Sequence, residues 1–440
     1  KTELNLRIEK GYENINLNVI FKQKDFAYKL LAVISLFITI FALSILIYKI
    51  IFNKNYSPKY PSFKISANIA LQTLKKNPIL GIGSGNYLES FNKYRSFDYN
   101  KTNIWAAKFN QGSSFLITNL TEIGILGSFA FLSLIAIFVN KAGWGLIQSL
   151  NLLSVTLNFV ILVFFPSSPI LIVTLFILLG LTSESKKHEY SMPTRIASLF
   201  VLLPLLVLIS LANYKIYIAT LAEYKYSQAL KSLETNNAKA VYDKLKQAIN
   251  LNSDVPQYHK VLSSVYFAMA NSVSQKNDLT DQNKEQATLF VQESINEAKA
   301  VVALNNKNSE NWQFLGKTYY LLIPFAKGAD QFAINSYKEA INFDPINPNL
   351  RIALGEVYML QKDYKNAIET FNLAVLAKDD LPNAHFNLAV AYRENKELDK
   401  AKNEINITLK LLNRDSKDFE IASKELRAIE ELLKLDSNPS

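Results

Sequence analysis

Long apolar runs in the first half of the chain constrain its fold more than any other feature. Five runs approach the roughly 20 apolar residues that a helix needs to cross a bilayer. They occupy residues 27–52, 116–139, 143–165, 168–182 and 196–213. Buried core helices of a soluble protein are the alternative, but repeated runs with almost no internal charge favour membrane spans. The fourth run is short and could be re-entrant.

Charge divides the chain into two unlike halves. Residues 1–215 contain 21 Lys and Arg against 9 Asp and Glu, whereas residues 216–440 contain 27 against 29. Short loops rich in Lys and Arg stay in the cytoplasm. Placing the N-terminal segment 1–26 and the basic connectors inside gives a five-span transmembrane domain over residues 27–215. Residues 216–440 then lie outside the cytoplasm, although losing the short fourth span would reverse their side.

The same path leaves a large loop, residues 53–115, on the outer face of the membrane. This loop carries nine Lys and Arg residues and two acidic residues. A basic segment beside a membrane needs an anionic partner. Lipid headgroups of the bilayer are one such partner, and a pyrophosphate-linked lipid substrate is the other.

Composition excludes several classes of protein. The chain has no Cys and three His, so disulfides, thiol nucleophiles and the common metal sites are not expected, and neither is any cofactor. Nucleic-acid binding is disfavoured because the positive charge lies in the apolar half. The chain begins with Lys1, and we therefore treat it as a candidate fragment that could lack further N-terminal helices.

A 34-residue period organises the C-terminal half. Residues 348–381 align with residues 382–415, and equivalent positions carry the same residue in the pairs Leu354 and Leu388, Tyr358 and Tyr392, and Ala367 and Ala401. Weaker copies precede them from residue 222, with insertions near residues 272–286 and 323–327, and a capping helix is expected over residues 417–435. The pattern resembles the tetratricopeptide repeat (TPR), in which stacked helix pairs form an α-solenoid. The expected fold is therefore all-α, with a polytopic transmembrane domain followed by a TPR α-solenoid.

Such arrays commonly bind a protein or peptide on their concave face, although this one could also act only as a spacer. His259 and His385 fall on repeat helices and are interpreted as packing or surface residues.

Two polar motifs lie in the outer loop. The glycines Gly81, Gly83 and Gly85 could cradle a phosphate or simply form a turn. At the end of the loop, Gln111, Ser114, Thr118 and Glu122 would share one face of a helix. A polar stripe at the end of a membrane helix should face a cavity, but Glu122 could instead pair with a lysine and anchor the helix.

Residues 27–215 resemble the C-terminal part of the O-antigen ligase and O-antigen polymerase family of membrane glycosyltransferases. The resemblance rests on NPILGIGSGNYLESF, the basic loop, and SSFLITNLTEIGILG. It implies a bacterial cytoplasmic-membrane enzyme that transfers glycan from an undecaprenyl-pyrophosphate carrier to an acceptor on the outer face, without a metal.

The resemblance also implies roles for particular residues. Arg95 would hold the pyrophosphate, Lys93 and Lys108 would support it, and Glu122 would be catalytic. The remaining substrate-binding candidates are Gly81, Gly83, Gly85, Gln111, Ser113 and Ser114. The family usually has a histidine where this chain has Ser113 and Ser114, so the alternative is a non-catalytic, membrane-anchored TPR scaffold for envelope assembly.

Overall fold

The computed structural model describes most of the chain from residue 60 onward. The described residues are 60–140, 146–166, 168–182, 194–235, 237–275 and 280–437, with the isolated positions Val33, Phe37, Ile40, Phe41 and Ser44. These parts are helical, and no strand occurs among them. The predictions for residues 1–26 and for most of the first apolar run lie outside the described residues.

The chain forms two compact units. Unit 1 comprises Lys1–Phe91 and Phe109–His188, and unit 2 comprises Asn92–Lys108 and Glu189–Ser440. The prediction placed the whole of residues 53–115 with the transmembrane domain. The structure instead groups Asn92–Lys108, called here the docked segment, with the C-terminal repeats.

Unit 1 is built on apolar helices that pack against one another. Its helices are α2 (Phe63–Lys76), the start of α3 (Tyr87–Tyr94), α4 (Phe115–Asn140), α5 (Leu146–Phe164) and α6 (Pro169–Thr182). The side chains of Val155, Leu162, Leu175 and Leu178 fill the core between α4, α5 and α6. Helix α2 packs on α4, and the hydroxyl oxygen of Ser62 caps its first turn by accepting a hydrogen bond from the Ile65 N–H.

Two described helices are long and apolar enough to cross a membrane. These stretches are Phe115–Ile137 of α4 and Leu202–Glu234, which lies in unit 2. The apolar stretches Leu152–Phe164 and Pro169–Gly180 are shorter. Two of the five stretches expected to span a membrane thus overlap a described helix that is long and apolar enough to do so.

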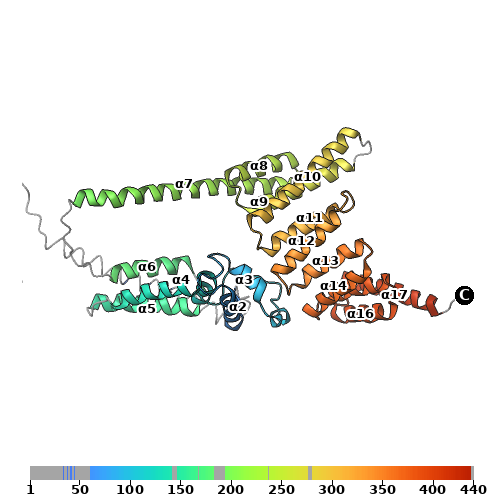
Figure 1. Cartoon of the computed structure of the whole chain (residues 1–440), viewed down its shortest axis with the longest axis horizontal. Coiled ribbons are helices and arrows are strands. Elements are labelled where there is room, and N and C mark those ends of the chain that lie inside the picture. The colour runs from blue at the N-terminus through green and yellow to red at the C-terminus, as the bar shows by residue number, and fades with distance from the viewer. Residues whose placement is uncertain are drawn as a thin grey trace, which may run out of the picture. The chain divides into compact units, whose positions relative to one another are not determined.

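Unit 2 begins with one unusually long helix. Helix α7 (Thr194–Glu234) contains the apolar run and then continues without a break into the first repeat, where it pairs with α8 (Ala238–Leu251) (Figure 1). Ala222 and Ala229 are fully buried on its repeat half. The sequence analysis placed a domain boundary between residues 215 and 216, and in the structure one helix crosses this boundary.

The remaining helices form successive hairpins. They are α9 (Pro256–Ser274), α10 (Asp281–Leu304), α11 (Ser309–Leu322), α12 (Ala329–Phe343), α13 (Pro348–Leu360), α14 (Tyr364–Ala377), α15 (Pro382–Glu394) and α16 (Leu398–Leu411), followed by α17 (Lys417–Ser437). The docked segment contributes a short 3-10 helix, Phe97–Lys101. Proline occupies the first turn of α9, α13 and α15, where its missing N–H costs nothing.

The 34-residue period is visible in the backbone as well as in the side chains. Gly328, Lys362 and Lys396 are spaced by 34 residues, and all have a positive φ, of 81°, 58° and 63°. Each lies in the turn between the two helices of a hairpin. Within the hairpins, a Cβ on Gly316 would lie 3.1 Å from the Tyr337 ring, and one on Gly355 would collide with Phe371. Small residues at these positions therefore let the paired helices pack closely.

The two expected insertions take different forms. In the second hairpin the helices themselves are longer, since α9 has 19 residues and α10 has 24. In the third hairpin, the extra residues form the connection between α11 and α12.

Candidate functional site

The residues selected from the sequence fall into two groups. Gly81, Gly83, Gly85, Gln111, Ser113, Ser114 and Glu122 belong to unit 1, whereas Lys93, Arg95 and Lys108 belong to the docked segment of unit 2.

The glycine-rich loop between α2 and α3 is hydrogen-bonded to the backbone of α4 at a point where this helix is interrupted. Gly124 interrupts α4 with φ 66° and ψ −166°, a conformation that is essentially restricted to glycine. The N–H groups of Ile82 and Gly83 donate to the carbonyl oxygens of Thr121 (3.1 Å) and Glu122 (2.8 Å). The loop thus satisfies carbonyl groups that the break would otherwise leave without a partner.

Hydrogen bonds also run in the opposite direction. The N–H groups of Ile125 and Leu126, just after the break, donate to the carbonyl oxygens of Pro78 (3.0 Å) and Ile79 (3.2 Å). A Cβ on Gly124 would collide with the Ile79 carbonyl oxygen. The two backbones therefore cross in direct contact.

This geometry decides between the two interpretations of the glycine motif. The Gly81 N–H donates to the Asn77 carbonyl oxygen at 3.2 Å, and the Gly83 N–H is bonded to Glu122. Gly85 has φ 80° and leads into α3. The structure uses the Gly81 and Gly83 N–H groups within a turn and does not present them to a phosphate.

Glu122 caps a helix. One of its carboxylate oxygens accepts a hydrogen bond from the N–H of Tyr87, the first residue of α3, at 3.2 Å. A carboxylate at a helix N-terminus also interacts favourably with the helix dipole. The alternative expectation, an ion pair with a lysine, is not seen for Glu122 among the described residues.

The expected polar stripe is divided because α4 begins at Phe115. Gln111 precedes the helix, and the Ser114 hydroxyl accepts a hydrogen bond from the Ile117 N–H at 3.3 Å. The Ser113 N–H donates to the Ser66 hydroxyl oxygen on α2 at 2.9 Å. Our expectation of one helical face from Gln111 to Glu122 is therefore wrong, since the chain turns before it enters the helix.

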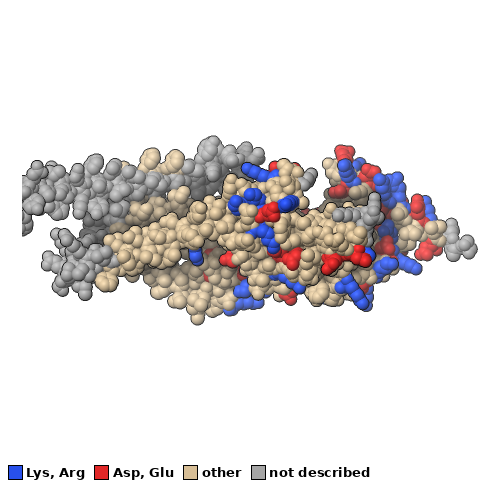
Figure 2. Space-filling model, turned by 90° about the horizontal axis from the view of Figure 1, so that it is seen from above, with Lys and Arg blue, Asp and Glu red and all other residues tan. Residues whose placement is uncertain are grey.

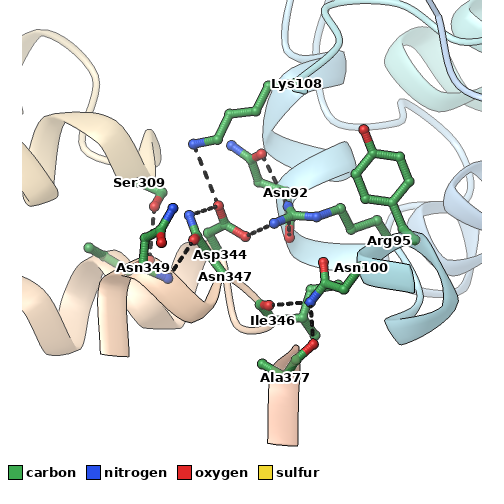
Figure 3. Close-up of polar contacts among 12 residues, drawn as sticks. Asn92, Arg95, Asn100, Lys108, Ser309, Asp344, Ile346, Asn347, Asn349 and Ala377 are labelled. Carbon is green, nitrogen blue, oxygen red and sulfur yellow. Dashed lines mark hydrogen bonds and ion pairs between the residues drawn. The ribbon is translucent and has the colours of Figure 1, made fainter. Parts of the chain in front are cut away.

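The docked segment is fixed to the repeats by a buried ion pair (Figure 3). An Nη atom of Arg95 lies 2.6 Å from Asp344 Oδ1, and the two side chains are 4% and 0% exposed. The Lys108 ammonium lies 3.5 Å from the other oxygen of Asp344 and 3.1 Å from Glu310. Asn347 donates to the same Asp344 carboxylate at 3.0 Å. Asp344 thus joins two cations of the segment to the turn between α12 and α13.

A second contact joins the docked segment to the backbone of two successive repeats. The Asn100 side-chain amide donates to the carbonyl oxygens of Ile346 (2.7 Å) and Ala377 (2.8 Å) (Figure 3). In return, the Lys378 ammonium donates to the Asn100 carbonyl oxygen at 2.9 Å and lies over the Trp105 ring, 5.1 Å from its centroid. Lys93 lies over the Phe343 ring at 5.5 Å. The docked segment therefore follows the edge of the solenoid formed by the turns between repeats.

The three cations stand out in the sequence, but the carboxylate and the rings that they contact do not. The signal was weak. Asp344 follows the second helix of its repeat, at the position where neighbouring repeats have Asn305 and Lys378. A carboxylate at one repeat boundary looks like an ordinary turn residue until the distant segment is placed against it.

His259 and His385 occupy equivalent places in two repeats. In each, one ring nitrogen faces a carboxylate, Glu297 at 2.5 Å or Glu404 at 2.6 Å. The other nitrogen lies 3.0 Å or 2.8 Å from the carbonyl oxygen six residues earlier in the chain. Trp312, in the first of the two repeats between them, makes the same carbonyl contact. These histidines pack within hairpins, as expected, and no three His, Asp or Glu residues of the described chain form a metal-binding group.

Both histidine pairs favour the charged ring. The hydrogen bond to Glu297 raises the pKa of His259 above its ordinary value of 6.5. Burial lowers the pKa of His385, but its bonds to Glu404 and to a carbonyl oxygen outweigh that effect and raise it overall.

We therefore expect the repeats to lose stability as the pH rises. A raised pKa means that the folded state binds the proton more tightly, so the stabilisation is complete below pH 6.5 and is lost as the pH rises from there through the higher pKa of the folded state. At about pH 6, His259→Gln or His385→Gln should each lower the unfolding free energy by about 1.5–3 kcal/mol. Urea unfolding at several pH values tests this, and the double variant should lose most of the pH dependence. A wild-type stability that stays constant or increases above pH 6.5 would contradict the expectation.

Three hollows surround the second hairpin. The largest, about 460 Å³, lies between α7, α8, α9 and α10. The next, about 420 Å³, is lined mainly by apolar side chains of α9, α10, the end of α11 and the connection to α12, including Phe267, Val291, Leu322 and Phe325. A smaller one of about 200 Å³ separates the first helices of neighbouring repeats, α9 and α11.

Comparisons with known proteins identify the repeats. A TPR repeat model matches residues 323–362, and a tetratricopeptide repeat model matches residues 348–380. The C-terminal region therefore contains tetratricopeptide repeats, and neither match describes an O-antigen ligase or polymerase. A search of curated protein sequences finds no match.

The solved structures that are similar to this chain have low sequence identity to it. The crystal structure of MamA is 16% identical over 44% of this chain and 94% of that chain, with a TM-score of 0.35. A thermophilic TPR protein of Thermus thermophilus is 17% identical over 47% and 99%, with a TM-score of 0.34. PilF of Pseudomonas aeruginosa is 14% identical over 50% and 93%, with a TM-score of 0.33.

Proposed function

We propose that this chain is a membrane-anchored TPR scaffold that presents its solenoid to a protein or peptide partner. The observation that carries the proposal is α7, a single helix that joins an apolar stretch to the first repeat hairpin. Within this described helix, no flexible linker separates the proposed anchor from the binding module.

The exposed surface of α7 supports the anchor. Residues 202–211 are all exposed, and Phe200 reaches 78% exposure. A helix that is apolar on every side and lacks protein neighbours matches a membrane span better than a soluble surface. A second apolar surface lies on α4, α5 and α6, which together contain one charged residue, Glu122. Figure 2 shows a long tan region that is almost free of Lys, Arg, Asp and Glu, whereas charged side chains gather toward the C-terminal repeats. We include multiple spans in a bacterial cytoplasmic membrane, with the solenoid outside the cytoplasm, as part of the proposal.

The hollows around the second hairpin support the proposal that the solenoid binds a protein or peptide. The two larger hollows are lined mainly by apolar side chains, and Phe325 at the rim of the 420 Å³ hollow is exposed. Apolar pockets with exposed aromatic rims are typical of protein and peptide interfaces. The repeat half has a slight excess of acidic residues, so nucleic acid is not proposed as a partner.

Photo-crosslinking in cells tests the scaffold. The photoreactive p-benzoylphenylalanine at Phe325 changes the side chain little and should yield one discrete crosslinked protein. The matched control is Leu376, which is 75% exposed on α14 away from the hollow and should yield none. Absence of a crosslink at Phe325, or the same products at both positions, would count against a partner in this hollow.

Transfer of lipid-linked glycan is the second candidate function. Glu122 supports it, because a carboxylate is held in a fixed position at a break in an apolar helix. Fixed charges of this kind can act in acid–base chemistry. Arg95, in contrast, is already committed to Asp344 in the structure.

The structure shows which variant separates the two candidates. Glu122→Gln keeps an oxygen that can accept the Tyr87 N–H and removes only the carboxylate. A scaffold should tolerate this change, with unchanged crosslinks and a normal surface-glycan pattern on gels. A transferase that uses Glu122 should lose glycan transfer. Arg95→Ala cannot make this distinction, because it breaks a buried ion pair in either case.

A further inference from the structure

We propose that the turn after α2 inserts into the lipid bilayer beside α4, with the lysines of α2 directed to anionic headgroups. The surface consists of Ile79 and Leu80 in the turn and Ile125, Leu126 and Phe129 on α4, and is called here the turn patch. The inference rests on the membrane anchoring proposed above and extends it to a segment that is not itself a span.

The turn patch is apolar, exposed and continuous. Leu80 is 70% exposed and Phe129 is 68% exposed. The hydrogen bonds of the Ile125 and Leu126 N–H groups to Pro78 and Ile79 place the turn directly against α4. Water would contact all of these side chains in a soluble protein. Contiguous exposed apolar surface of this kind marks an interaction site.

Exposure along α4 changes at the break. Residues 115–124 are buried or half-buried, whereas Ile125, Leu126 and Phe129 are exposed. The glycine loop and α2 cover the first part of the helix, and nothing among the described residues covers the second part on this side. If α4 enters the bilayer, the turn patch enters it alongside the exposed part of the helix.

Charge favours lipid as the occupant. Helix α2 carries Lys64, Lys75 and Lys76 and no acidic residue, and its last turn contains two of these lysines. Exposed Phe63 and Leu71 extend the apolar surface along the same helix. A helix with apolar and cationic exposed residues, ending in an apolar turn, has the composition of an interfacial membrane segment. Basic residues close to an anionic membrane surface strengthen the attraction of the segment to it.

The absence of cysteine makes a direct test possible in the full chain. Single cysteines at Leu80, Ile137 and Lys101 would each carry an NBD fluorophore in phosphatidylcholine–phosphatidylglycerol vesicles, with and without nitroxide-labelled phospholipid. Ile137 lies on the exposed surface of α4 and serves as the membrane reference. Lys101 is exposed in the docked segment and serves as the aqueous reference. We expect the label at Leu80 to lose most of its emission, as at Ile137, while the label at Lys101 keeps its emission.

The outcomes separate this inference from the proposed function. Quenching at Ile137 without quenching at Leu80 would overturn the insertion of the turn, leave the anchor intact, and assign the turn patch to a protein partner. Failure of quenching at Ile137 would contradict both the insertion of the turn and the membrane anchor. Lys75→Glu with Lys76→Glu should also reduce quenching at Leu80 in vesicles containing phosphatidylglycerol, whereas Lys101→Glu should not. Equal effects of the two charge changes would refute the role of the α2 lysines.

Discussion

Replacing Asp344 by asparagine should remove about 3–5 kcal/mol from the unfolding free energy of the repeat unit. The carboxylate is fully buried and faces both Arg95 and Lys108. Without it, the Arg95 guanidinium keeps its charge in a site from which water is excluded, and it has lost the ion pair with Asp344. The docked segment can escape this cost only by leaving the solenoid.

Two measurements check this result. Urea unfolding, followed by circular dichroism, should show the loss of stability, and trypsin should cut after Arg95 much faster than in the wild type. Asp281→Asn is the matched control, because the Asp281 side chain is 98% exposed and pairs with Lys284, which is 62% exposed. An exposed pair of this kind contributes less than about 1 kcal/mol. Equal losses in the two variants, or unchanged trypsin cleavage in Asp344→Asn, would show that the ion pair does not hold the segment.

Gly124→Ala should disrupt the crossing of the glycine loop and α4. The backbone at Gly124 is in a region that costs other residues about 1–3 kcal/mol. The added Cβ would also collide with the Ile79 carbonyl oxygen and lie 2.6 Å from the Gly81 nitrogen. Overpacking of this kind adds about 1–3 kcal/mol, so the total loss should be about 2–6 kcal/mol.

Thermal unfolding in detergent and trypsin cleavage at the end of α2 measure this effect. Gly180→Ala on α6 is the control, since nothing lies within 4 Å of its added Cβ. This change should be neutral or stabilise by about 0.5–1 kcal/mol, as expected inside a helix. If Gly124→Ala behaved like Gly180→Ala, the break in α4 would not be a fixed feature of the fold.

The repeats were the part of the fold most accessible from sequence, because their signals are local and periodic. Leu354, Tyr358 and Ala367 recur after 34 residues, and the structure places each on the packed face of its hairpin. Proline at the first helical turn marked several helix starts for an equally local reason.

The docked segment was not accessible in the same way. Arg95 and Asp344 are separated by about 250 residues of chain, and no periodicity links them. The basic charge of the loop suggested an anionic partner, and one such partner is a carboxylate of the same chain. The break at Gly124 was missed because the surrounding residues read as one continuous apolar helix, and only the approach of a second backbone shows that it is interrupted.

The continuity of α7 has a geometric consequence for the solenoid. An α-helix advances about 1.5 Å and rotates about 100° with each residue. Inserting or deleting one residue between residues 212 and 218 would therefore rotate the first hairpin by about 100° around the helix axis, but would shift it along the axis by only about 1.5 Å. The apolar end of α7 would thus determine the rotational orientation of the hollows about the helix axis. A flexible tether would leave this orientation free.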